Sequence, residues 1–224
     1  MESHVPHCES KQIIALGLVF PALYNGPINY YARLVRQKEI VLEQYDSYSK
    51  QSYRNRCMIM GPNGVIALSI PVIKWHGSKS HIKDVRIDYD SHWNRIHWKS
   101  LVASYASSPF FEYLADELSP IYERSFEYLI DLNHILLDFT LHQLGLEIHI
   151  KRSESFTRIT TDQDPRHFIH PKKDQAVADP GFKPEAYHQV FSDRLGFRSN
   201  LSILDLIFNV GPGALGYLQG SLRT

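Results

Sequence analysis

The strongest constraint on the fold is the order of an apolar run, a helical pattern and a second apolar run within residues 13–42. Residues 13–19 form a continuous apolar stretch of the length expected for a buried strand. Residues 27–37 carry apolar side chains at helical spacing, with Asn25 as the expected N-cap, and residues 40–42 form a second short strand. Strand, helix and strand in this order predict a βαβ unit whose strands pair in parallel.

An Asn-Gly pair predicts a β-hairpin further along the chain. Asn63 and Gly64 separate the apolar runs 57–60 and 65–72, and Asn-Gly between two such runs is a strong signal for a tight turn. Residues 85–87 alternate between apolar and charged side chains and predict another short strand.

The chain from residue 93 to residue 145 has helical periodicity and predicts three helices, with Gly145 ending the third. Residues 146–150 then alternate as in a strand. We therefore expect a single domain over residues 1–224, of the α/β class, with a mixed sheet, an N-terminal βαβ unit, a β-hairpin and a helical insertion at about 93–145.

Positive charge is concentrated in residues 47–83, which contain six Lys or Arg and no Asp or Glu. The whole chain is neutral, with 24 Lys and Arg against 24 Asp and Glu, so broad nucleic-acid binding is not expected. Two arginines, Arg54 and Arg56, flank Asn55, and arginine binds carboxylate or phosphate with two hydrogen bonds at once. This basic segment predicts a pocket for an anionic or sugar-type small molecule. A solvated basic turn that binds nothing is the alternative.

The spacing within the basic segment is compatible with two geometries. On a helix, Lys50 and Arg54 share one face and Gln51 and Asn55 another, whereas on a strand Arg54 and Arg56 share a face. The sequences GxxxxGK[ST] and GxGxxG are both absent from the chain, so the common nucleotide-binding loops are missing and no cofactor is identified.

Two residues are candidates for proton transfer. His97 shares a predicted helix face with Trp93 and Tyr105, although a hydrogen-bonded core histidine fits the same pattern. Asp205 lies inside the apolar run 201–208, which predicts a short buried helix, and a buried carboxylate needs a partner. We expect Asp205 to pair with an arginine of the basic segment.

Twelve histidines and two cysteines show no metal-binding spacing, so no metal site is expected. Cys8 and Cys57 are far apart in the chain and suggest free thiols in a reducing compartment. The apolar run 13–23 is too short to span a membrane and contains Pro21. A cytoplasmic protein without a transmembrane segment is therefore expected.

Several motifs together resemble a known family. They are Phe20-Pro21 with Gly26-Pro27-Ile28-Asn29-Tyr30, Lys50-Gln51-Ser52-Tyr53-Arg54-Asn55-Arg56, Asn63-Gly64, Leu68-Ser69-Ile70-Pro71-Val72, Trp93 with His97-Trp98, Tyr105 with Ser108-Pro109-Phe110-Phe111-Glu112, Ile169-His170-Pro171-Lys172, Tyr187 with Gln189-Val190-Phe191, and Asn200 to Leu206 with Asn209 and Gly211-Pro212. The chain resembles the WbqC-like protein family over nearly its whole length. It departs from the commoner family start, Tyr-Leu-Pro-Trp, where it has Phe20-Pro21-Ala22-Leu23-Tyr24.

The resemblance implies a role in bacterial surface-polysaccharide or O-antigen biosynthesis. An enzyme that transfers an acyl or aminoacyl group, such as glycyl, to an amino sugar or nucleotide sugar is the first hypothesis. A non-catalytic binding or assembly protein of the same pathway is the second, and a buried polar network that only fixes the hairpin is the third. The candidate catalytic residues are His97 and Asp205, and the candidate substrate-binding residues are Lys50, Gln51, Tyr53, Arg54, Asn55, Arg56, Trp93, Tyr105, Tyr187 and Gln189.

Overall fold

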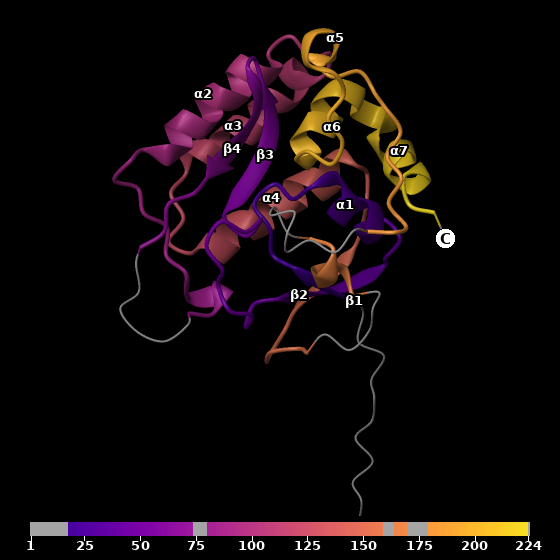
Figure 1. Ribbon diagram of the computed structural model, residues 1–224. Coiled ribbons are helices and arrows are strands. Elements are labelled where there is room, and N and C mark those ends of the chain that lie inside the picture. Colours follow the sequence, from indigo (N-terminus) through magenta and orange to yellow (C-terminus); the bar gives the residue numbers. More distant parts are fainter. Residues whose placement is uncertain (1–17, 74–79, 159–163, 170–178, 224) are drawn as a thin grey trace, which may run out of the picture.

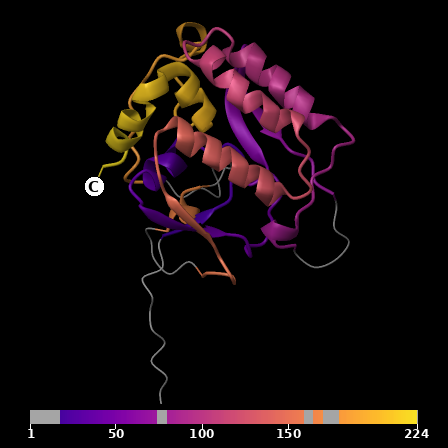
Figure 2. The ribbon, with the colours of Figure 1, turned by 180° about the vertical axis from the view of Figure 1, so that it is seen from behind.

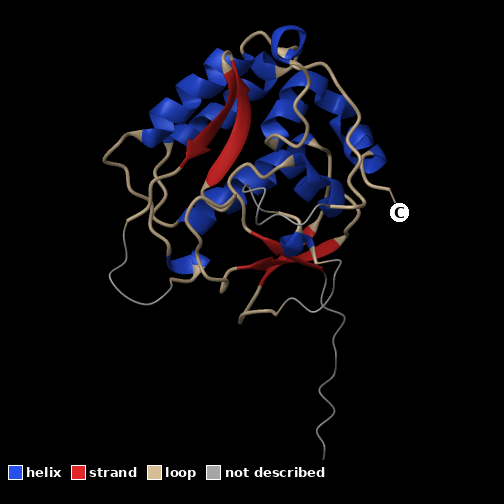
Figure 3. Cartoon of the chain, viewed as in Figure 1, coloured by secondary structure: helices blue, strands red, loops and turns tan. Residues whose placement is uncertain are grey.

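The strands of the computed structural model, which describes residues 18–73, 80–158, 164–169 and 179–223, form two separate sheets (Figures 1 and 3). A parallel sheet has the order β1-β2-β5, and an antiparallel hairpin consists of β3 and β4. The expected α/β class is confirmed, and the parallel and antiparallel pairs belong to different sheets. The strands are β1 (Leu18–Pro21), β2 (Glu39–Glu43), β3 (Arg56–Gly61), β4 (Gly64–Ser69) and β5 (His149–Arg152).

The N-terminal βαβ unit is confirmed. Helix α1 (Ile28–Leu34) connects β1 to β2, and the two strands pair in parallel with Val19 opposite Val41. The first strand lies later than expected and includes Pro21, which an edge strand tolerates. The remainder of the predicted strand, residues 13–17, lies outside the described residues.

Asn25 is not the N-cap of α1, contrary to the sequence-based expectation. Pro27 occupies that position, and Asn25 lies two residues earlier with a left-handed φ of 43°. Its side-chain amide donates to the hydroxyl of Tyr122 at 3.0 Å instead of capping the helix. Asn25 therefore bonds to Tyr122, which is distant in the chain, and not to the first turn of α1 as the sequence suggested.

The predicted hairpin is present, with Gly61 paired to Gly64 across a turn of two residues, Pro62 and Asn63. Gly64 has a φ of 125°, a conformation that side chains disfavour. Residues 85–87 do not form a strand with regular pairing. They contribute isolated bridges, in which Arg86 pairs with Tyr128 and Ile87 with Val72.

Three long helices follow the hairpin as expected, and Gly145 ends the third with a φ of 64°. They are α2 (Trp93–Tyr105), α3 (Phe111–Glu123) and α4 (Leu129–Gln143). Shorter helices are η1 (Ile82–Asp84), η2 (Pro165–His167), α5 (Ser192–Leu195), α6 (Ile203–Val210), η3 (Gly211–Gly213) and α7 (Ala214–Gly220).

The elements surround a shared core in which α4 is central. Figure 1 shows the parallel sheet at the base, the hairpin with α2 and α3 on one side, and α6 and α7 on the other. The reverse view shows α4 crossing between the parallel sheet and the pair α2 and α3 (Figure 2). The largest buried side chains include Tyr24, Tyr30, Tyr31 and Tyr105, so many hydroxyls need partners inside the core. Among the described helices, none is both long and apolar enough to cross a bilayer.

Candidate functional site

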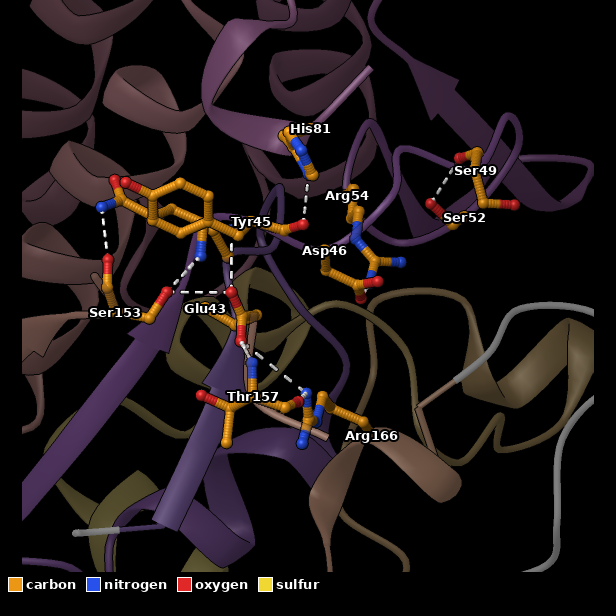
Figure 4. Close-up of polar contacts among 12 residues, drawn as sticks. Glu43, Tyr45, Asp46, Ser49, Ser52, Arg54, His81, Ser153, Thr157 and Arg166 are labelled. Carbon is orange, nitrogen blue, oxygen red and sulfur yellow. Dashed lines mark hydrogen bonds and ion pairs between the residues drawn. The ribbon is translucent and has the colours of Figure 1, made fainter. Parts of the chain in front are cut away.

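Glu43 ends β2, the central strand of the parallel sheet, and its carboxylate is buried at the carboxyl edge of that sheet. Oε1 accepts hydrogen bonds from the Tyr45 N–H and the Ser153 hydroxyl, both at 2.8 Å. Oε2 accepts one from the Thr157 N–H at 2.9 Å and lies 3.9 Å from Nη1 of Arg166 (Figure 4). These donors and the cation compensate the burial of the charge. Ligands of α/β proteins commonly bind at this edge, so the candidate site begins here.

Basic side chains of the segment contact Tyr45 and Asp46, which follow shortly after Glu43. Arg54 forms an ion pair with Asp46, and His81 hydrogen-bonds to the carbonyl of Tyr45 (Figure 4). The ammonium of Lys83 lies 4.8 Å from the centre of the Tyr45 ring. The absence of acids within residues 47–83 is therefore misleading, because Asp46, just before this range, compensates Arg54.

The other residues of the basic segment divide into exposed and anchoring positions. Lys50 and Gln51 are exposed, and Gln51 has a left-handed φ of 58°. Tyr53 is buried and its carbonyl accepts from the Tyr24 N–H at 2.9 Å. Asn55 is buried too, and its amide donates to the Ile70 carbonyl at 2.9 Å. Tyr53 and Asn55 therefore fix the segment to the core, and Lys50 and Gln51 are accessible to a ligand.

Arg56 is the first residue of the hairpin, and its hydrogen-bond partner Ser69 belongs to a second feature, a surface pocket. Its Nε donates to the Ser69 hydroxyl at 2.8 Å, directly across the two strands. Ser69 also hydrogen-bonds through its backbone to His97. The pocket has a volume of about 430 Å³, and its walls include Ser69, Trp93 and His97. Ser69 thus connects a cation of the basic segment to the histidine in the pocket wall.

His97 belongs to a buried chain of hydrogen bonds. Its Nδ1 lies 2.7 Å from the Tyr24 hydroxyl, which lies 3.0 Å from the hydroxyl of Tyr122. The Tyr122 hydroxyl in turn accepts from the amide of Asn25. Burial lowers the pKa of His97 to about 4, and its bond with the Ser69 backbone opposes this shift. The imidazole is therefore neutral near pH 7, and its Nδ1 shares a hydrogen bond with the Tyr24 hydroxyl.

Asp205 lies on α6 and is completely buried, as the sequence predicted. Its carboxylate accepts hydrogen bonds from the Tyr105 hydroxyl at 2.9 Å, the Tyr187 hydroxyl at 2.5 Å and the Gln189 amide at 2.7 Å. Burial raises the pKa of Asp205, and the hydrogen bonds from Tyr187, Gln189 and Tyr105 lower it. Four of the predicted site residues are therefore brought together, in a cluster separate from the basic segment.

The expected pairing of Asp205 with an arginine is wrong. Arg54 pairs with Asp46 and Arg56 with Ser69, and each oxygen of Asp205 has uncharged donors. The prediction failed because it considered only charged partners. A carboxylate with three good donors is satisfied without a cation.

Sequence reasoning also missed Glu43. The available signal was its position, since it is the first acidic residue after the apolar run 40–42 and parallel strands place such residues at the functional edge. Arg166 and Thr157 could not be assigned to Glu43 from the sequence, because more than a hundred residues separate them from it. Within the described ranges, no three His, Cys, Asp or Glu side chains gather so as to hold a metal ion.

Comparisons with known proteins agree with the resemblance seen in the motifs. The family model described as "WbqC-like protein family" matches residues 23–176, which is more than half of the chain. A relative described as "Uncharacterized protein Rv1507c", from Mycobacterium tuberculosis (strain ATCC 25618 / H37Rv), is 25% identical over 212 residues. That match covers 85% of this chain and 91% of the relative. No solved structure matches the chain significantly.

The Asp205 cluster gives a prediction for stability. Asp205→Ala should reduce the free energy of unfolding by about 3 kcal/mol or more, because it leaves buried hydroxyl and amide donors without an acceptor. In urea denaturation, the double variant with Tyr187→Phe should lose about 1–3 kcal/mol less than the sum of the single variants, since the two groups share a bond. The double variant with Arg54→Ala should be additive within about 0.5 kcal/mol. Coupling to Arg54 comparable with that to Tyr187 would contradict this assignment.

His97 gives a prediction for pH dependence. Its pKa is lower in the folded protein, about 4, than its ordinary value of 6.5, so the unfolded chain binds the proton more readily. The contribution of His97 to stability is complete above about pH 6.5 and is lost as the pH falls towards 4, a change of about 3 kcal/mol. The unfolding free energy of His97→Gln should therefore depend less on pH than that of the wild type. The exposed His188→Gln should follow the wild type, and equal slopes for all three proteins would refute the shift.

Proposed function

The chain belongs to the WbqC-like protein family, and from this premise we propose that it transfers an acyl or aminoacyl group, such as glycyl, to an amino sugar or nucleotide sugar of surface-polysaccharide or O-antigen biosynthesis. In this proposal the ligand lies along the basic segment and its reacting end enters the pocket beside His97. A cytoplasmic location, where nucleotide sugars are made, is part of the proposal.

One observation carries the proposal. Nε of Arg56 lies 2.8 Å from the Ser69 hydroxyl, and His97 hydrogen-bonds to the Ser69 backbone. Ser69 and His97 both belong to the wall of a pocket of about 430 Å³. An arginine beside a pocket suits an anionic group, and a neutral imidazole in the wall suits proton transfer. Small-molecule sites typically combine a concave, mostly apolar pocket with a few polar groups of this kind.

The basic segment supplies the binding groups in this proposal. Arg54 and Arg56 both act on the half-buried Tyr48, because their charges oppose the burial that raises its pKa to about 12. Both guanidiniums therefore lie near Tyr48, and Lys50 is exposed two residues further along the chain. We assign the phosphate or carboxylate of the ligand to this region, and its hydroxyls or amides to the exposed Gln51. Asn55 is buried and bonded to the Ile70 carbonyl, so it supports the segment rather than contacting the ligand.

The proposed reaction moves one proton. The amino nitrogen of the acceptor attacks the acyl carbonyl of an activated donor, a C–N bond forms, the bond to the leaving group breaks, and the nitrogen loses a proton. We assign this proton to His97, whose Nδ1 exchanges its hydrogen bond with the Tyr24 hydroxyl in order to take it. Asp205 was the other candidate, and its three hydrogen bonds favour a supporting role in which it holds Tyr105, Tyr187 and Gln189 in place.

The second candidate function is a non-catalytic binding or assembly protein of the same pathway. A specific observation favours it, because Nδ1 of His97 and both oxygens of Asp205 already have hydrogen-bond partners inside the protein. A catalytic His97 has to exchange a partner during the reaction, whereas a binding protein requires no such exchange.

Anion binding is the first test. Phosphate or a uridine-diphosphate amino sugar at a hundred times its dissociation constant should stabilise the protein by about 2.7 kcal/mol, measured as a thermal shift. Arg56→Ala should remove this stabilisation, because its Nε bonds to Ser69 of the pocket wall, and Arg54→Ala should weaken it. Arg95→Ala, an exposed position on α2, should retain it. A shift that persists in Arg54→Ala and Arg56→Ala alike would refute the assigned region.

Turnover separates the two candidate functions. The protein is incubated with a uridine-diphosphate amino sugar and a panel of donors, acyl thioesters on one side and amino acids with ATP on the other. Mass spectrometry should detect an acceptor that is heavier by the acyl group. His97→Gln should lower the rate by about a hundredfold or more, as expected for loss of a general base, while His188→Gln should not. Binding without product from any donor would favour the non-catalytic function.

A further inference from the structure

The amide oxygen of Asn25 is buried without a hydrogen-bond partner among the described residues. The whole residue is 1% exposed, and its Nδ2 donates to the Tyr122 hydroxyl at 3.0 Å. Most buried acceptors in proteins have a partner, so an exception needs a physical reason. Asn25 stands at one end of the chain of hydrogen bonds that passes through Tyr122 and Tyr24 to His97, and that chain supplies the reason.

The groups along this chain are uncharged at neutral pH. Burial raises the pKa of Tyr24 and of Tyr122, so both hydroxyls keep their protons. Burial also raises the pKa of Cys57, the thiol that acts on both tyrosines. The described residues of the pocket wall beside His97 include no Asp, Glu, Lys or Arg. The direction of the chain therefore depends on where the hydroxyl and imidazole protons point.

Ser69 fixes the position of the imidazole proton. The bond between its backbone and His97 raises the pKa of the imidazole, so it favours the protonated ring and runs from a ring N–H to the Ser69 carbonyl. Nδ1 lies 2.7 Å from the Tyr24 hydroxyl, which leaves Nε2 for the carbonyl. A neutral imidazole has a single N–H, so Nδ1 is then an acceptor.

One of the two possible directions satisfies the neutral chain. If Tyr24 donates to His97, it can accept from Tyr122, which accepts from the Asn25 amide, and every N–H and O–H has an acceptor. In the opposite direction the Tyr122 proton meets the amide nitrogen of Asn25, and Nε2 of His97 turns a lone pair to the Ser69 carbonyl. Such mismatches of buried groups cost free energy, so the first direction is the resting one.

We propose that Asn25 is a positioning residue whose side-chain amide turns over when His97 takes up a proton. The imidazolium has a proton on each nitrogen, so Nδ1 must donate to Tyr24 and the chain reverses. Tyr24 then donates to Tyr122, whose proton needs an acceptor at Asn25. A half-turn of the amide brings the idle oxygen to Tyr122. The proposal rests on the proposed function only in giving His97 the proton of the acceptor.

Asparagine suits this position in two ways. Its amide carries a donor and an acceptor of nearly the same size, so the half-turn needs no extra space in the packed core. Its backbone has a φ of 43°, a left-handed conformation in which asparagine is enriched. The Ser202 hydroxyl holds the Asn25 carbonyl at 2.9 Å, so the backbone is fixed while the side-chain amide keeps a single bond, to Tyr122.

The nitrogen-15 resonances of His97 test the resting direction. At pH 7 they should show the neutral tautomer with its proton on Nε2, and they are assigned by their loss in His97→Gln. The tautomer with its proton on Nδ1 would overturn the proposal, because it belongs to the opposite direction.

Acid titration tests the reversal. As the pH falls from 6.5 towards 4, the side-chain amide resonances of Asn25 should shift with the same midpoint as the nitrogens of His97. They are assigned by their loss in Asn25→Gly. Asn29 is the matched control, because its buried amide bonds to the Phe168 carbonyl outside the chain and should not follow His97. An Asn25 amide that ignores the titration, or acid unfolding that His97→Gln prevents, would refute the reversal.

Two variants should block the reversal and keep the resting direction. Tyr122→Phe removes the link, and Asn25→Gly removes the terminal acceptor while tolerating the left-handed backbone. In each, the ratio of protonated to neutral His97 at pH 4 should fall about tenfold, as one hydrogen bond commonly supplies. Ser202→Ala loses a bond of the same turn and should titrate as the wild type does. An equal fall in Ser202→Ala, or none in the two blocked variants, would contradict the positioning role.

These measurements need no substrate, so their outcome is separable from that of the proposed function. Coupled titration of Asn25 and His97 without turnover from any donor supports the positioning role and removes the catalytic one. Turnover with an Asn25 amide that does not respond to His97 supports the transferase and removes the positioning role.

Discussion

The fold depends on the hydrogen bonds of the turn between β1 and α1. In this turn the Tyr24 N–H donates to the Tyr53 carbonyl at 2.9 Å, and the Gly26 carbonyl accepts from the Ile203 N–H at 2.9 Å. The Asn25 carbonyl accepts from the Ser202 hydroxyl at 2.9 Å. Asn25 itself keeps a left-handed conformation that costs about 1 kcal/mol or more, so these bonds must hold it. The basic segment and α6 are thereby fixed to the carboxyl end of the parallel sheet, where the candidate site lies.

Two buried carboxylates extend this anchoring by different means. Glu43 has hydrogen-bond donors and Arg166 at 3.9 Å, and Arg166 also bonds to Asp164 at 2.7 Å. Asp205 has three uncharged donors, two of which, Tyr187 and Gln189, come from the loop before α5. Each carboxylate therefore draws a late, irregular part of the chain onto the core, because a buried charge has to collect donors wherever the chain can supply them. The loops are ordered by this requirement rather than by apolar packing alone.

The sequence was sufficient for features that depend on local patterns. The βαβ unit, the hairpin at Asn63 and Gly64, the helices from residue 93 and the burial of Asp205 all follow from periodicity and turn chemistry. It was insufficient where the partner of a polar group lies far away in the chain. Asn25 has an ordinary N-cap sequence but bonds to Tyr122, and nothing local identifies Tyr105 as the donor to Asp205. The basic segment shows the same limit. Its charge follows from the sequence, but the ion pair between Arg54 and Asp46 could not be predicted from it.

The pairing of charges determines what kind of ligand the basic segment can favour. An anion that approaches Arg54 competes with Asp46, so the gain in attraction is offset by loss of an existing ion pair. Arg56 has a neutral partner, the Ser69 hydroxyl, and an anion there replaces only a hydrogen bond. Arg56, which is half-buried, therefore provides most of the attraction, and a single cation near the surface gives modest affinity in water. Selectivity must come from groups that contact the rest of the ligand, and Ser69 connects Arg56 to the pocket walled by Trp93 and His97, where such groups are available.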